Sequence, residues 1–150
     1  MKTENQICSL ESAKKLKELG VEQKSLWYWV KTDLDVDTDK FQLVINSKGY
    51  VHYGINVKVP DYGYGADGSY GWRSIEKEYS AFTVAELGEM LPEKLNNEWL
   101  TCQKVGGYWE AGYKGEGDTW IEKEDKIEAE ARAKMLIYLL ENKLIEKGEK

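Results

Sequence analysis

Aspartate stands at every second position of the segment DLDVDTDK, at Asp33, Asp35, Asp37 and Asp39. Carboxylates this close together can ligate calcium or act as acid and base in catalysis, and an EF-hand loop places oxygen ligands at positions 1, 3 and 5. That loop also needs glycine at position 6 and glutamate at position 12, where this chain has Thr38 and Val44. Adjacent carboxylates repel one another unless a cation or solvent screens them. We therefore expect residues 33–40 to form a mobile connection between two strands, with weak divalent-cation binding and a catalytic cluster as alternatives.

Two segments rich in glycine and aromatic residues are further candidates for a site, PDYGYGADGSYGW at 60–72 and GGYWEAGYKGEGDTW at 106–120. Glycine lets a backbone approach a ligand closely, and aromatic faces stack on bases or sugar rings. Neither segment has the complete dinucleotide-binding or P-loop pattern, so no phosphate-binding loop is indicated. The segments are either hairpin loops whose tyrosines cover the edge of a sheet or a surface that binds a ligand or partner. The candidate contact residues are Tyr62, Tyr64, Tyr70, Trp72, Arg73, Tyr108, Trp109 and Tyr113.

The sequence contains no recognisable catalytic constellation. His52 is the single histidine, and no pattern places a serine or cysteine nucleophile beside it. Cys8 and Cys102 lack CxxC or Cys/His spacing, so we expect reduced thiols and no zinc site. Paired carboxylates could serve a glycoside hydrolase, but the sequence does not show which carboxylates converge. We therefore favour a non-enzymatic protein with no cofactor and no metal.

The composition is that of a globular protein that forms a single domain over residues 1–150, because 41% of the residues are hydrophobic and 32% are charged. The net charge of −6 disfavours binding to nucleic acid or to anionic membranes. The longest apolar run, MLIYLL at 135–140, is far shorter than the roughly 20 residues of a membrane span. The first ten residues have no apolar signal core, so we expect neither membrane insertion nor export.

Three helices are expected, at about 9–19, 84–91 and 126–146. Ser9 is a suitable N-cap for the first, and Gly20 can adopt the left-handed conformation that ends it. Thr83 and Glu86 have the spacing of a capping box at the start of the second. Asp125 is expected to help open the third helix, whose segment 135–140 is apolar on all sides and should be buried.

Strands are expected between these helices. The aromatic segment 25–30 is followed by a hairpin over 41–59 with the turn NSKG. A second hairpin pairs 98–105 with 108–114 around Gly106 and Gly107, and 118–123 can add an edge strand. The predicted fold is α+β, with an antiparallel sheet of about five to six strands built from two hairpins and the helices packed on it.

Three blocks resemble a group of small uncharacterised proteins that bacteriophages and prophages encode. They are NQICSLESAKKLKELGV at 5–21, YSAFTVAELGEMLP at 79–92, and a block at 129–145 that contains EARAKMLIYLLENKLI. The resemblance implies a phage or mobile-element accessory protein in the cytoplasm of a bacterial host, and it transfers no activity. The first hypothesis is therefore a non-enzymatic protein that binds a host protein. The alternative is a protein that binds a nucleotide or other small ligand and sequesters a host signal, with phosphates meeting Lys58, Arg73 or Lys114.

Overall fold

The computed structural model describes residues 5–32, 41–47, 50–53, 75–114 and 119–146. Within them, the helices are α1 (Leu10–Glu18), α2 (Val84–Met90) and α3 (Glu128–Glu141). The first sheet contains β1 (Trp27–Thr32), β2 (Gln42–Ser47), β3 (Tyr50–Tyr53) and β4 (Ile75–Ser80). The second sheet contains β5 (Lys94–Leu95), β6 (Glu98–Val105), β7 (Tyr108–Lys114) and β8 (Thr119–Asp125). The acidic segment 33–40, the glycine-rich segment 60–72 and the last two residues of the NSKG turn, 48–49, lie outside the described residues.

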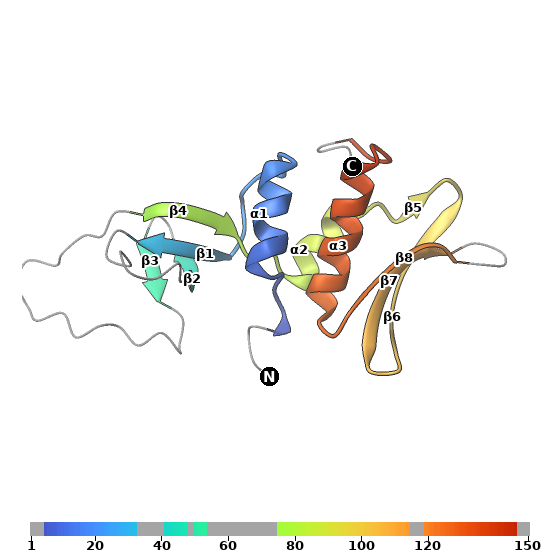
Figure 1. The fold of residues 1–150 in the computed structure, drawn as a ribbon, viewed down its shortest axis with the longest axis horizontal. Helices are drawn as coiled ribbons and strands as arrows, with labels where there is room; N and C mark the ends of the chain where they lie inside the picture. The colour runs from blue at the N-terminus through green and yellow to red at the C-terminus, as the bar shows by residue number, and fades with distance from the viewer. Residues whose placement is uncertain (1–4, 33–40, 48–49, 54–74, 115–118, 147–150) are drawn as a thin grey trace, which may run out of the picture.

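The helices lie between two four-stranded antiparallel sheets, whose strand orders are β3-β2-β1-β4 and β5-β6-β7-β8 (Figure 1). Helix α1 contacts β4 of the first sheet, whereas α3 contacts β7 and β8 of the second and also both other helices. The α+β class is thus confirmed. The single sheet of five to six strands was wrong, because the two hairpins belong to separate sheets on either side of the helices.

Strands β4 and β5 were not predicted from the sequence. Strand β4 joins the first sheet through β1, with Tyr28 opposite Ser80, so its position depends on a contact between distant parts of the chain. Strand β5 pairs with β6 across a tight turn, in which Asn96 and Asn97 have φ angles of 47° and 71°. Asparagine tolerates this left-handed region better than most residues, which allows the two-residue connection to β6.

The first two helices begin as their capping residues predict, and the first also ends at the predicted glycine. The Ser9 side chain accepts a hydrogen bond from the backbone N–H of Ser12, and Gly20 ends α1 with a φ of 80°. Both halves of the capping box between Thr83 and Glu86 are present at α2. These bonds satisfy backbone N–H groups that have no partner within the helix.

Helix α3 is shorter than the predicted 126–146. Its N-cap is Ile127, and Asp125 accepts the Ile127 N–H at 3.0 Å without capping the helix itself. The helix ends at Glu141 because Lys143 adopts a left-handed φ of 54°, and the next N–H, of Leu144, bonds back to the carbonyl of Leu139. This is the Schellman arrangement with lysine in the position that glycine usually takes, so the sequence carried no obvious stop signal there.

The main hydrophobic core lies where the three helices meet the inner side of the second sheet. Its largest fully buried side chains include Leu16, Phe82, Leu87, Tyr113, Met135 and Leu139. The expectation that the middle of the last helix is buried is confirmed for Met135, Leu136 and Leu139, whereas Ile137, Tyr138 and Leu140 are half-buried. The core therefore fixes the inner side of the second sheet against α3.

Candidate functional site

Strands β6 and β7 direct alternate side chains to opposite sides of the second sheet. On the inner side, Leu100, Cys102, Trp109, Ala111 and Tyr113 pack in or against the core. The residues between them point the other way, since successive side chains of a strand alternate. In the part of the chain that the structure describes, the helices contact the inner side and no helix covers the outer one (Figure 1).

Three large hydrophobic side chains are exposed on this outer side. The exposed fractions are 57% for Trp99, 46% for Val105 and 43% for Tyr108. Val105 and Tyr108 lie opposite each other beside the hairpin turn, and Trp99 lies six residues back along β6, which corresponds to roughly 20 Å. We refer to Trp99, Val105 and Tyr108, with the two lysines beside Trp99, as the outer sheet face.

The two lysines are Lys94 and Lys114. Lys94 Nζ lies 5.1 Å from the centroid of the Trp99 ring, a cation–π contact. Lys114 is the direct cross-strand partner of Trp99. The tryptophan end of the outer sheet face is therefore both aromatic and positively charged, whereas the middle of the same side carries Gln103 hydrogen-bonded to Glu110.

The predicted contact residues of the second glycine-rich segment do not share one surface. Tyr108 is on the outer sheet face, but Trp109 is half-buried on the inner side and Tyr113 is fully buried. The Tyr113 hydroxyl donates a 2.8 Å hydrogen bond to the carbonyl of Pro92, and burial raises the pKa of the phenol. Tyr113 is thus a core residue here. The other predicted residues, Tyr62, Tyr64, Tyr70, Trp72 and Arg73, lie outside the described residues.

Trp99 was not among the predicted contact residues. The alternation of side chains along β6 is the signal that identifies Trp99. Because Leu100 and Cys102 point inward, Trp99 must point outward. An exposed tryptophan on a sheet is a stronger indicator of a contact surface than a glycine-rich turn.

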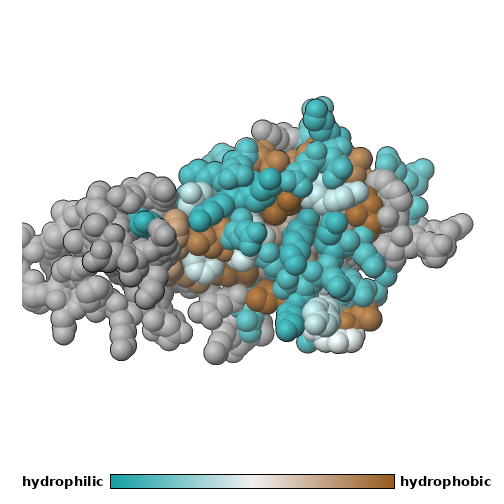
Figure 2. Space-filling model, viewed as in Figure 1, coloured by the Kyte–Doolittle hydropathy of each residue, from teal (hydrophilic) through white to brown (hydrophobic). Residues whose placement is uncertain are grey.

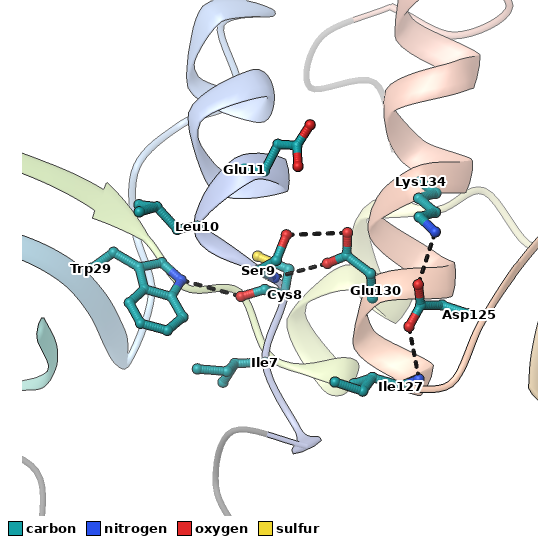
Figure 3. Close-up of a pocket in the computed structure, with 10 residues that line it drawn as sticks. All are labelled: Ile7, Cys8, Ser9, Leu10, Glu11, Trp29, Asp125, Ile127, Glu130 and Lys134. Carbon is teal, nitrogen blue, oxygen red and sulfur yellow. Dashed lines mark hydrogen bonds and ion pairs between the residues drawn. The ribbon is translucent and has the colours of Figure 1, made fainter. Parts of the chain in front are cut away.

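A second candidate is an open cavity of about 570 Å³ between the N-terminal ends of α1 and α3 and the adjoining strand β1 (Figure 3). Its apolar wall consists of Ile7, Leu10, Trp29 and Ile127. Its charged groups are Glu11, Asp125, Glu130 and Lys134. We refer to this space as the α1–α3 cavity.

Glu130 is the most strongly held of these charged groups. Its carboxylate accepts hydrogen bonds from the backbone N–H of Ser9 at 2.8 Å, from the Ser9 hydroxyl at 3.1 Å and from the Ser12 hydroxyl at 2.6 Å. A carboxylate offers about four acceptor positions, so roughly one remains. Glu130 thereby joins the start of α1 to α3 and presents its residual negative charge to the cavity.

Asp125 and Lys134 form an ion pair of 2.8 Å at the other side of the cavity. Burial would raise the pKa of Asp125, but the Lys134 ammonium and the Ile127 N–H outweigh it and hold that pKa below its usual value. The same pairing raises the pKa of Lys134. Trp29 is fixed by its indole N–H, which donates to the carbonyl of Cys8 at 3.2 Å. The ion pair and the indole are therefore ordered before any ligand arrives.

The two cysteines are poorly suited to nucleophilic chemistry. Cys8 is fully buried, and burial raises the pKa of its thiol to about 12. Burial likewise raises the pKa of Cys102, which lies beside Glu128. The thiolate is the reactive form, so both thiols are unreactive near neutral pH.

The described residues also offer little for metal or histidine chemistry. Among them, no three His, Cys, Asp or Glu residues are grouped to hold a metal ion. His52 lies on β3 opposite Ile45.

Comparison of the chain with protein-family models, with curated proteins and with solved structures finds no significant match. No helix in the described ranges is both long and apolar enough to cross a membrane. Function is therefore inferred from the two candidate surfaces.

Proposed function

We propose that the protein is a non-enzymatic phage or mobile-element accessory protein that binds a host protein in the bacterial cytoplasm through its outer sheet face. The observation that carries the proposal is Trp99, a tryptophan that remains 57% exposed on a sheet whose opposite side is packed on helices. Tryptophan and tyrosine are enriched among the residues that dominate binding energy at protein interfaces. The three-block resemblance to phage-encoded proteins supports a host partner.

The distribution of polarity agrees with a localised contact surface. Most of the surface that the helices show in Figure 2 is hydrophilic, with hydrophobic surface visible between them. Among the described residues, the large hydrophobic side chains that are exposed are Leu26, Trp99, Val105 and Tyr108. Three of these four lie on the same side of the second sheet, Trp99 toward one end and Val105 with Tyr108 at the other, and Leu26 precedes the first sheet. Large apolar groups that gather on one side of a protein mark interaction sites more often than scattered ones.

The proposal is tested by capture from a bacterial lysate with the full chain as bait. The double variant Trp99→Ala/Tyr108→Ala should lose the captured host protein, and its melting temperature should change little because both side chains are exposed. Leu26→Ala is the matched control, since Leu26 is 55% exposed and lies outside the outer sheet face. Capture that survives the double variant, or that never occurs with the folded wild-type protein, would contradict the proposal.

A second candidate function is binding of a nucleotide or similar small anionic ligand. The observation that favours it is the position of Lys94 and Lys114 on either side of Trp99. A base can stack on an indole while ammonium groups meet its phosphates. A thermal-shift panel of nucleotides and cyclic dinucleotides distinguishes the two functions: a shift of several degrees that Trp99→Ala removes supports nucleotide binding, and an unchanged melting temperature throughout the panel argues against it.

A further inference from the structure

The α1–α3 cavity carries an excess of negative charge. Three carboxylates, Glu11, Asp125 and Glu130, line it with a single ammonium, Lys134, which leaves two negative charges. Lys134 is already bound to Asp125, so the excess resides on Glu11 and Glu130. Glu11, on α1, and Glu130, on α3, face each other across the space between the two helices (Figure 3).

Glu11 differs from the other carboxylates of the cavity in having no partner. Glu130 holds the first turn of α1 and Asp125 pairs with Lys134, but no hydrogen bond or ion pair within the described residues involves Glu11. Its position in the first turn of α1 is favourable for a negative charge near a helix N-terminus. Glu11 is therefore free to bind a cation without breaking a contact of the fold.

The remaining wall of the cavity suits the stem of a long cationic side chain. Ile7, Leu10 and Ile127 provide aliphatic surface, and Trp29 provides an indole whose N–H is already occupied by the Cys8 carbonyl. An alkyl chain can bury itself along such a wall while its charged end remains beside carboxylates. An indole face also attracts ammonium and guanidinium groups.

We propose that the α1–α3 cavity binds a lysine or arginine side chain of the partner protein, with its alkyl stem along Trp29 and its cationic end between Glu11 and Glu130. This inference rests on the proposed function, because it assigns to the partner a basic residue in addition to the surface that meets Trp99. The net charge of −6 of the whole chain favours approach of such a residue.

The test uses n-butylguanidinium chloride as the probe and the full-length protein labelled with nitrogen-15. The indole N–H resonance of Trp29, assigned with Trp29→Phe, should shift saturably with n-butylguanidinium and not with butyrate at the same ionic strength. Glu11→Gln should weaken binding of the probe by roughly two- to fivefold, as expected for one partly screened charge. Glu89→Gln, which changes an exposed glutamate of α2 outside the cavity, should leave the affinity unchanged.

Three outcomes overturn the inference: no saturable shift, an equal response to butyrate, or the same affinity in wild type and Glu11→Gln. The peptide acetyl-Gly-Arg-Gly-amide should bind at least as tightly as the probe, and tighter binding of spermidine than of this peptide would assign the cavity to a free polyamine instead. Glu11→Gln in the lysate capture separates the two proposals. Capture that depends on Trp99 but not on Glu11 leaves the proposed function intact and removes the cavity from the interface.

Discussion

The Ser12 hydroxyl donates a 2.6 Å hydrogen bond to the carboxylate of Glu130, 118 residues further along the chain. Ser12 is only 5% exposed, and Glu130 also accepts two hydrogen bonds from Ser9 at the start of α1. A single carboxylate of α3 therefore caps α1 from outside and satisfies a buried hydroxyl. Two helices that are far apart in the sequence are joined by a polar contact within the cavity wall.

Glu130→Ala should destabilise the fold. The substitution leaves the buried Ser12 hydroxyl and the Ser9 N–H without their acceptor, and unsatisfied buried groups cost about 1–3 kcal/mol. Urea denaturation measures the free energy of unfolding. Glu141→Ala is the matched control, because Glu141 also joins α3 to α1, through an exposed ion pair with Lys15, and such pairs contribute about 0–1 kcal/mol. Equal losses in the two variants would contradict the structural role of Glu130.

Gly112→Ala should destabilise the second sheet. A Cβ at this position would lie 2.6 Å from the carbonyl oxygen of Ile121 and 3.1 Å from Glu122 Cβ, so β7 and β8 would have to move apart. Overpacking of this kind typically costs about 1–3 kcal/mol. Gly106→Asn is the control at the hairpin turn, where φ is +58° and a Cβ would meet no atom within 4 Å, since asparagine tolerates that conformation. Thermal unfolding should show a clear loss for the first variant and little for the second.

Lys134→Gln should raise the pKa of Asp125. In the wild type, burial raises the pKa of Asp125, but Lys134 and the Ile127 N–H outweigh it and hold that pKa low, so removal of the ammonium takes away part of what opposes burial. Because the pKa of Asp125 is lower in the folded state, the pair contributes stability above the unfolded pKa of about 3.9 that disappears as the pH falls through the folded value.

A carbon-13 titration of the Asp125 carboxyl group checks this prediction between about pH 2 and pH 6. Lys126→Gln is the control, because Lys126 is exposed and adjacent in sequence, but the ion pair with Asp125 is made by Lys134. A titration midpoint that is the same in Lys134→Gln and wild type would show that the ion pair does not persist in solution.

The sequence predicted the helix starts at Ser9 and Thr83 because their caps are local. A side chain three residues away supplies each bond, so short-range spacing determines the result. It did not predict the division into two sheets, because that depends on which strands pair. The neighbour of β1 is β4, which brings Tyr28 opposite the distant Ser80, and no local pattern specifies such a contact.

The candidate site was predictable only in part. Strand periodicity could have identified Trp99 as outward-facing, but the α1–α3 cavity combines Trp29 with residues near both ends of the chain. Glu11 and Glu130 appear in the sequence as ordinary charges on helix surfaces. Only the packing of α1 beside α3 makes them two sides of one space.

The protein should lose stability at alkaline pH because of Cys8. Burial raises the pKa of the Cys8 thiol to about 12, compared with about 8.5 in an unfolded chain. The folded state therefore keeps a proton that the unfolded state has released. The stability that this group contributes is complete below about pH 8.5 and is lost as the pH rises toward 12, by up to about 1.4 kcal/mol per pH unit.

Urea denaturation at a series of pH values from about 8 to 10 checks this, with Cys8→Ala compared with wild type. The variant should have a flatter pH dependence, because alanine has no proton to release on unfolding. Cys102→Ala is the control, because Cys102 is less buried than Cys8, although burial raises the pKa of its thiol as well.

In the native protein, a thiol reagent should modify Cys102 before Cys8, since Cys8 is fully buried. Equal slopes in Cys8→Ala and wild type, or faster modification of Cys8, would show that Cys8 is accessible to water in solution.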